Sequence, residues 1–162
     1  MRQLHPARGT VALGLVAFGL LLGAGRHAKA LPPTNALVIL NTGTTDTIGY
    51  RIVIPPSGEA FFVTGKGPGQ KQLPAKLLKK LHKDLAAVGS LEQMAVRTPC
   101  PKPAASATTT TLQYHGQFSG DLTCAGDKRA VKLQKVITEV VKVLGVTNVP
   151  RSEGQELPPQ RF

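Results

Sequence analysis

Alternating apolar and polar positions predict three short strands. Residues 36–40 form a compact apolar run that suits a buried strand. Residues 48–54 alternate, so that four large side chains fall on one face, and these two segments are expected to pair antiparallel. Residues 59–63 supply a third strand after a turn of proline, serine and glycine. The one-sided residues of the second strand are Ile48, Tyr50, Ile52 and Ile54.

Helical periodicity appears in the middle of the chain and again near its end. Residues 74–88 repeat apolar side chains every three or four positions, with Pro74 in a favoured first-turn position and Gly89 just past the end. A second helix is expected to start after Asp127, a suitable N-cap, and to run to about Leu144. The two apolar stripes are Leu77, Leu81, Leu85 and Val88, and Leu133, Val136, Ile137, Val140, Val141 and Leu144.

A threonine-rich hairpin is predicted between the helices. Residues 108–114 form its first strand, His115 and Gly116 its turn, and residues 117–124 its return strand. If Tyr114 pairs with Gln117, Cys124 lies opposite Ala107.

The order of these segments predicts an α+β fold. Two amphipathic helices would pack on an antiparallel sheet in the order β-β-β-α-β-β-α, with one disulfide. The glycine-rich segment 65–69 is expected to be a flexible surface loop, because its spacing does not match a phosphate-binding loop. We expect one domain over residues 31–149 and a disordered tail over residues 150–162, which is polar and contains two prolines.

The first thirty residues have the layout of a secretory signal peptide. Arg2 and Arg8 precede an apolar run over residues 11–25, and the small-residue triplet 28–30 follows. The apolar run is shorter than the roughly 20 residues of a membrane-spanning helix. Cleavage after Ala30 would give a secreted or periplasmic protein without a transmembrane anchor.

Removal of this leader leaves 16 basic and 9 acidic residues, a formal charge of +7 on 132 residues. The only two cysteines, Cys100 and Cys124, are expected to form one disulfide in an oxidising compartment. A loop of this size would stabilise the fold by about 3 kcal/mol. Neither cysteine has metal-ligand spacing, so no metal or other cofactor is expected.

The sequence favours a binding protein over an enzyme. His115, Ser119 and Asp121 contain the residue types of a nucleophilic triad, but an isolated hairpin would expose them to solvent rather than align them. The lack of tryptophan and the scarcity of other aromatic residues argue against a deep ligand cleft or specific nucleic-acid binding.

The polar faces of both predicted helices are rich in lysine. If the helices pack side by side, these ammonium groups would form a salt-sensitive site for an anionic envelope polymer. The alternative is a merely solvated face that keeps the protein soluble. The candidate residues are Lys76, Lys79, Lys80, Lys83, Lys128, Lys132, Lys135 and Lys142.

The stretch from Cys100-Pro101-Lys102 through the segments 109–116 and 119–124 resembles uncharacterised small exported bacterial proteins. Their shared pattern is a Cys-bounded, Thr-rich hairpin preceded by an amphipathic helix. The resemblance covers about the central third of the chain and implies no catalytic residue.

The chain also resembles subtilisin-inhibitor-like proteins, a family of secreted proteinase inhibitors. The resemblance lies in the order of elements and in the segment 84–89 followed by Cys100-Pro101-Lys102. It implies that Lys102, between Pro101 and Pro103, is the specificity residue of an inhibitory loop aimed at a trypsin-like target. The chain departs from that family in having one disulfide instead of two, a proline after the specificity residue and a long second helix.

The expected function is therefore a secreted or periplasmic non-catalytic interaction domain whose partner is an unknown protein or an anionic envelope polymer. The alternatives are a proteinase inhibitor that presents Lys102 and a polyanion-binding surface protein. The oligomeric state is left open by the sequence.

Overall fold

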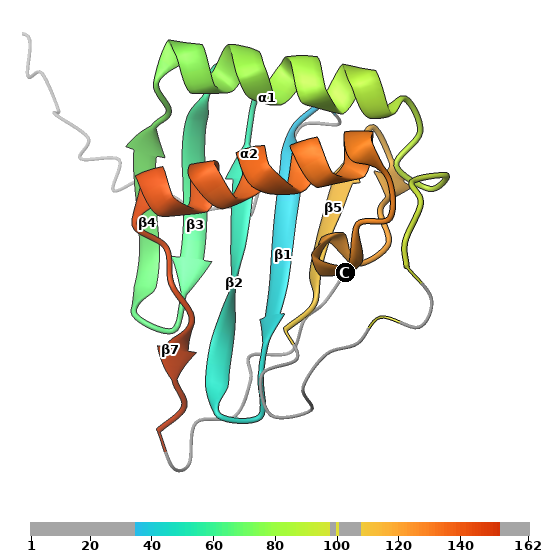
Figure 1. Cartoon of the computed structure of the whole chain (residues 1–162). Helices are drawn as coiled ribbons and strands as arrows, with labels where there is room; N and C mark the ends of the chain where they lie inside the picture. Colours follow the sequence, from blue (N-terminus) through green and yellow to red (C-terminus); the bar gives the residue numbers. More distant parts are fainter. Residues whose placement is uncertain (1–34, 98–99, 101–107, 153–162) are drawn as a thin grey trace, which may run out of the picture. The chain divides into compact units, whose positions relative to one another are not determined.

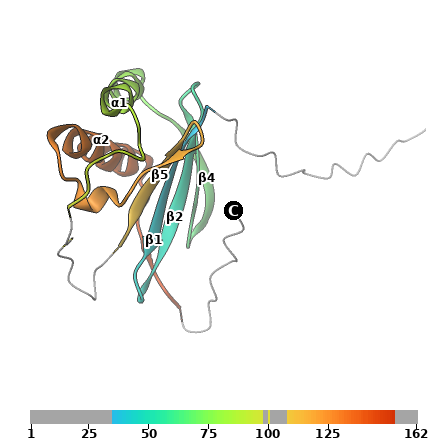
Figure 2. The same cartoon turned by 90° about the vertical axis from the view of Figure 1, so that its right-hand side faces the viewer.

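The computed structural model describes residues 35–97, 100 and 108–152. These residues form two layers, an antiparallel sheet and a pair of helices on one of its faces (Figures 1 and 2). The predicted α+β class, with two helices on an antiparallel sheet and one disulfide, is confirmed.

The described sheet has seven strands in the order β4-β3-β2-β1-β5-β6, and β7 pairs with the free part of β2. The strands are β1 (Leu37–Gly43), β2 (Thr47–Ile54), β3 (Glu59–Thr64), β4 (Gly67–Gln72), β5 (Thr110–Tyr114), β6 (Gln117–Phe118) and β7 (Val149–Pro150).

The core lies between the sheet and the helices. Ile39 of β1 pairs with Ile52 of β2 on one side and with Leu112 of β5 on the other. All three side chains have 0% exposure, and they form a row across the three central strands. The face predicted for Ile52 and Ile54 is therefore the covered face.

The two helices bury the predicted stripes against this row. Helix α1 (Ala75–Val88) follows Pro74, and α2 (Lys128–Leu144) starts at Asp127, whose Oδ1 accepts N–H bonds from Arg129 at 2.7 Å and Ala130 at 2.8 Å. Helix α2 ends at Gly145, whose left-handed φ of 72° closes the last turn. The helices run side by side in opposite directions (Figure 1).

The prediction of a flexible loop over residues 65–69 is wrong. The chain turns at Gly65 and Lys66 and continues as β4, which pairs with β3 from Thr64–Gly67 to Glu59–Gln72. A Cβ at Gly69 would lie 2.3 Å from the Phe62 ring, so this glycine lets the aromatic ring cover the strand pair.

The long return strand predicted after the His115–Gly116 turn is also wrong. Tyr114 pairs with Gln117 as expected, but β6 ends at Phe118. The chain then forms a short 3-10 helix, η2 (Leu122–Cys124), because the Asp121 carboxylate accepts the Thr123 N–H and caps a turn.

The start of the predicted tail belongs to the sheet. Pro150 pairs with Thr47, and the Arg151 N–H donates to the Asp46 carbonyl at 2.8 Å. The predicted leader with its cleavage position after Ala30, and residues 153–162 of the predicted tail, lie outside the described residues. Within the described part of the chain, no helix is long and apolar enough to cross a membrane.

Candidate functional site

The Cys100–Cys124 disulfide anchors the residue that immediately precedes the proline- and lysine-containing segment 101–107. The bond is present as predicted, with a Cα–Cα distance of 5.6 Å. Cys124 is buried at the end of η2, and Cys100 is half-buried. The chain at Cys100 is therefore joined covalently to the body of the protein.

Backbone hydrogen bonds strengthen this attachment on the incoming side. Val96 forms an isolated antiparallel bridge with Ala125. The Arg97 N–H donates to the Cys124 carbonyl at 2.7 Å, and the Gly126 N–H donates to the Ala95 carbonyl at 2.8 Å. Residues 95–97 thus lie against the chain that carries Cys124.

The outgoing side of the same segment is held by β1. The Thr42 N–H donates to the Thr109 carbonyl at 3.0 Å, and the Thr109 N–H donates to the Thr42 Oγ1 at 3.1 Å. The chain then enters β5, where Thr110 pairs with Asn41 and accepts a 2.9 Å hydrogen bond from its side-chain amide.

Asp121 connects the two sides. Its Oδ1 accepts the Thr110 N–H at 3.1 Å, the Thr123 N–H at 3.0 Å and the Thr123 hydroxyl at 2.8 Å. One carboxylate therefore links the start of β5 to η2, which carries Cys124. The sequence predicted Asp121 to be a polar residue of the return strand, although an Asp two residues before a Thr is a typical turn-capping pattern.

The candidate inhibitory residues Pro101, Lys102 and Pro103 lie outside the described residues. What the structure shows is the frame on either side of them. We call this frame the brace: the Cys100–Cys124 disulfide, the Val96–Ala125 bridge, the Thr42–Thr109 pair and the Asp121 carboxylate.

The three hairpin residues of triad type have separate structural contacts. The Ser119 hydroxyl accepts the Leu112 N–H at 2.8 Å and donates to the Gly120 carbonyl at 2.7 Å. Asp121 is engaged in the brace, and the exposed His115 ring lies edge-on to Tyr114 with centroids 4.0 Å apart. These contacts give no ordered line from serine to histidine to acid.

One group in the described part of the chain has the residue types of a metal site. Potential ligand atoms of Cys100, Asp121 and Cys124 lie within 4.8 Å of one another. A cysteine binds metal as a thiolate, and here the two sulfur atoms are bonded to each other. In this state the group is part of the brace.

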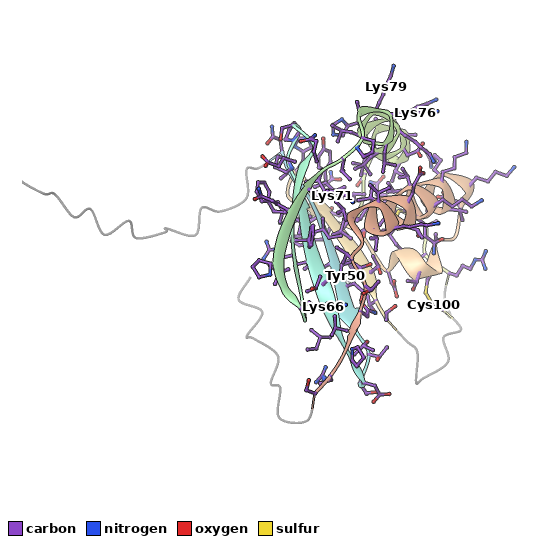
Figure 3. All side chains as sticks on the ribbon, turned by 90° about the vertical axis from the view of Figure 1, so that its left-hand side faces the viewer. Tyr50, Lys66, Lys71, Lys76, Lys79 and Cys100 are labelled. Carbon is purple, nitrogen blue, oxygen red and sulfur yellow. A yellow bond between two sulfur atoms is a disulfide. The ribbon has the colours of Figure 1, made fainter. Side chains whose placement is uncertain are left out.

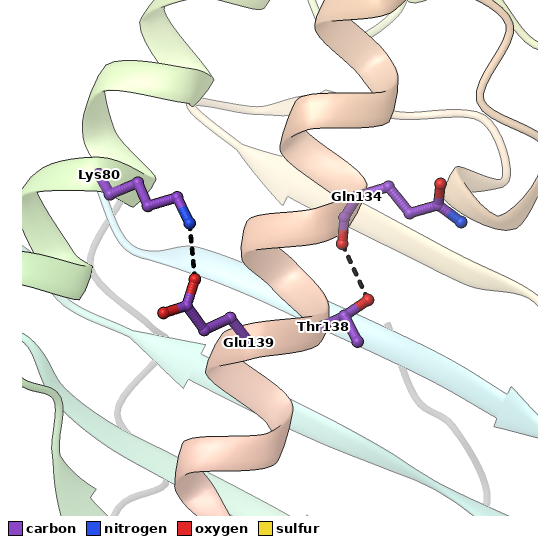
Figure 4. Close-up of polar contacts among 4 residues, drawn as sticks. All are labelled: Lys80, Gln134, Thr138 and Glu139. Atoms are coloured by element: carbon purple, nitrogen blue, oxygen red, sulfur yellow. Dashed lines mark hydrogen bonds and ion pairs between the residues drawn. The ribbon is translucent and has the colours of Figure 1, made fainter.

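The predicted lysine faces lie on the outer surface of the helix pair. All eight candidate lysines are exposed, and Figure 3 shows Lys76 and Lys79 projecting from α1. The Lys80 Nζ lies 2.6 Å from the Glu139 Oε2 of α2, which joins the two helices across their seam (Figure 4). The side-by-side packing on which the polyanion hypothesis depends is therefore present.

Comparison with family models found no match for this chain, and the searches of curated proteins and of solved structures gave no significant match either.

Proposed function

We propose that this protein is an exported, non-catalytic interaction domain that inhibits a trypsin-like proteinase, with Lys102 as the specificity residue. The observation that carries this proposal is the brace. It attaches both ends of the segment that contains Lys102 to the same region of the sheet and η2.

Attachment at both ends lowers the entropic cost of binding in a proteinase cleft. A free peptide loses much of its binding energy when its backbone is ordered, and a segment constrained beforehand loses less. The brace also keeps the two ends near each other if a bond between them is hydrolysed, so the products do not separate. The first effect strengthens binding, and the second slows the release of a cleaved segment.

The residue types around Lys102 suit a trypsin-like target. Lysine carries a compact positive charge on a long stem, and trypsin-like specificity pockets contain an aspartate at their base. Cys100 comes two residues earlier, so the specificity residue follows the covalent anchor almost directly. Pro103 has no backbone N–H and a restricted φ, and we expect it to make the bond after Lys102 a poor cleavage substrate.

Titration of a trypsin-like and a subtilisin-like proteinase with residues 31–162 tests this function. We expect stoichiometric inhibition of the trypsin-like enzyme, retention of inhibition in Lys102→Arg and its loss in Lys102→Ala. The matched control is Lys66→Ala, which removes an exposed lysine from the β3–β4 turn and leaves the brace intact.

A flat titration of the trypsin-like enzyme by the folded protein contradicts the proposal. So does equal inhibition by Lys102→Ala and the unmodified protein. Circular dichroism of each variant confirms that the sheet and helices are retained, so a loss of inhibition is assigned to the side chain rather than to unfolding.

A further inference from the structure

The positive charge of the described residues is concentrated in one layer of the fold. Helices α1 and α2 carry nine Lys and Arg residues and two acidic residues, which gives a net charge of +7. All other described residues carry five basic and five acidic side chains and are neutral as a group. We call the outer surface of α1 and α2 the basic layer.

Seven of the eight lysines of the basic layer follow the seam between the two helices. On α2, Lys128, Lys132, Lys135 and Lys142 lie on the same stripe as Glu139, because they are spaced by three or four residues. On α1, Lys76 and Lys83 share a stripe with Lys80 by the same spacing. The Lys80–Glu139 ion pair brings these stripes together, and its side chains are 52% and 48% exposed, so the seam is open to solvent.

This arrangement partly opposes the electrostatic preferences of the helices themselves. Lys76 lies in the first turn of α1, where the helix dipole disfavours positive charge. Lys128 and Arg129 lie in the first turn of α2 beside the Asp127 cap, and only Lys142 lies in a last turn, where the dipole favours a cation. Neither first turn contains an acidic residue. Like-charge pairs also stand four residues apart, as in Lys76–Lys80, Lys79–Lys83 and Lys128–Lys132.

Solubility alone does not explain such a pattern, because charges of both signs spread over the surface would achieve it with less repulsion. Local choices that work against the stability of an element are typical of functional surfaces. A bound polyanion would offset the repulsion between these lysines by pairing with their ammonium groups.

The chemistry of the layer selects among polyanions. The apolar faces of both helices are buried against the sheet, and the large exposed hydrophobic residues lie elsewhere in the described chain, so the layer has nothing to insert into a lipid membrane. Neither helix contains a phenylalanine, tyrosine or tryptophan on which a nucleobase would stack, and His82 of α1 lies off the stripe of Lys76, Lys80 and Lys83. Eight of its nine cations are lysines, which bind phosphate as point charges and demand no fixed geometry from it, so a row of them suits a repeating phosphate chain.

From this segregation of charge we infer that the basic layer is a binding site for a linear phosphate polymer without bases, which lies along the α1–α2 seam. The seam follows the 17 residues of α2, a length of about 25 Å. This site is separate from the brace and does not depend on the proposed inhibition.

Inorganic polyphosphate is the probe for a binding titration of residues 31–162 between about 50 and 200 mM salt. The test variant is Lys83→Gln, Lys132→Gln and Lys135→Gln. The matched control is Arg51→Gln, Lys66→Gln and Arg97→Gln, which removes the same charge from exposed residues outside the layer.

We expect salt-dependent binding that the test variant weakens by roughly tenfold or more, with a log–log salt slope lower by about 2 because three phosphate contacts are lost. The control is expected to keep both affinity and slope. Polyphosphate should raise the melting temperature of the unmodified protein, since a ligand of the folded state stabilises it, and should raise that of the test variant less. Without polyphosphate the test variant should melt at a higher temperature than the unmodified protein, because repulsion is removed.

Three results overturn the inference. The first is no binding of polyphosphate at the lowest salt, and the second is an equal loss of binding in test and control variants, which would show attraction to net charge only. The third is preferential binding of heparin, single-stranded DNA or anionic phospholipid vesicles over polyphosphate. None of these results bears on the proteinase titration, so failure of the polymer site and failure of the inhibitory function are distinguishable.

Discussion

The two faces of the sheet have similar apolar sequences but different surroundings. On the covered face, Ile39, Ile52 and Leu112 are fully buried beneath the helices. On the opposite face, which we call the open face, Phe61 and Phe118 are 42% and 51% exposed. Strand alternation alone places neighbouring residues on faces with such different environments.

The open face nevertheless has a partly continuous apolar row. Phe61 pairs with Val53, and Val53 pairs with Val38, so three strands place apolar side chains next to each other. Exposure rises along this row, from 3% at Val38 of β1 through the half-buried Val53 of β2 to 42% at Phe61 of β3. On the covered face the central side chains are fully buried, and Tyr50 and Phe62 farther along it are half-buried.

The largest expected difference between the faces is in their contribution to stability. Ile52→Ala should lower the free energy of unfolding by about 2–5 kcal/mol, because it leaves a cavity beneath the helices. Val63→Ala, at a 54% exposed position on the next strand, should change it by no more than about 0.5 kcal/mol. Urea unfolding followed by circular dichroism measures both values.

Equal losses in the two variants would break the comparison, since they would mean that the open face is covered in solution as well. Val63→Thr serves as a second probe there, because it keeps the shape of the side chain and adds a hydroxyl group. It should be tolerated at an exposed position and costly at a covered one.

The covered face was predictable from the sequence because its apolar residues have the period of their element. The stripes of residues 75–88 and 128–144, and the alternation of residues 48–54, mark the buried side directly. Strand β4 has no such signal, since its residues are glycine, proline, glutamine and lysine. It forms because β3 offers a complete edge for pairing, which is a property of the neighbouring strand.

The candidate sites also differ in how much of each the sequence predicted. Helical spacing predicted the eight lysines, and packing of α1 against α2 brought them to one surface. The disulfide followed from there being only two cysteines. The role of Asp121 was missed, because its partner Thr110 is eleven residues away and the predicted return strand would have directed Asp121 differently.

The next largest effect is expected from loss of the disulfide, which belongs to the brace rather than to either face of the sheet. Cys100→Ser with Cys124→Ser should lower the free energy of unfolding by about 3 kcal/mol, because the unfolded chain loses a covalent constraint over a separation of 24 residues. Inhibition of the trypsin-like enzyme should weaken by more than the increase in the unfolded fraction explains, because only hydrogen bonds then hold the brace together. Unchanged inhibition in a folded double variant would show that the disulfide does not position the segment.

The smallest expected effect is a pH dependence at the start of the basic layer. The pKa of Asp127 is held below its ordinary value of 3.8, chiefly by the hydrogen bond from the Ala130 N–H and also by the Arg129 N–H and guanidinium. Because the folded pKa is the lower one, the stabilisation is present above 3.8 and is lost as the pH falls through the folded value.

Asp127→Asn separates this charge effect from capping, because asparagine caps a helix as well as aspartate does but does not titrate. The variant should lose less stability than the unmodified protein between neutral pH and the acid side of this window, as measured by urea unfolding at each pH. Glu59→Gln is the control, since it removes one exposed carboxylate from β3 and leaves the cap of α2 intact. Identical acid sensitivity in Asp127→Asn and the unmodified protein would assign the dependence to other carboxylates and limit Asp127 to a neutral capping role.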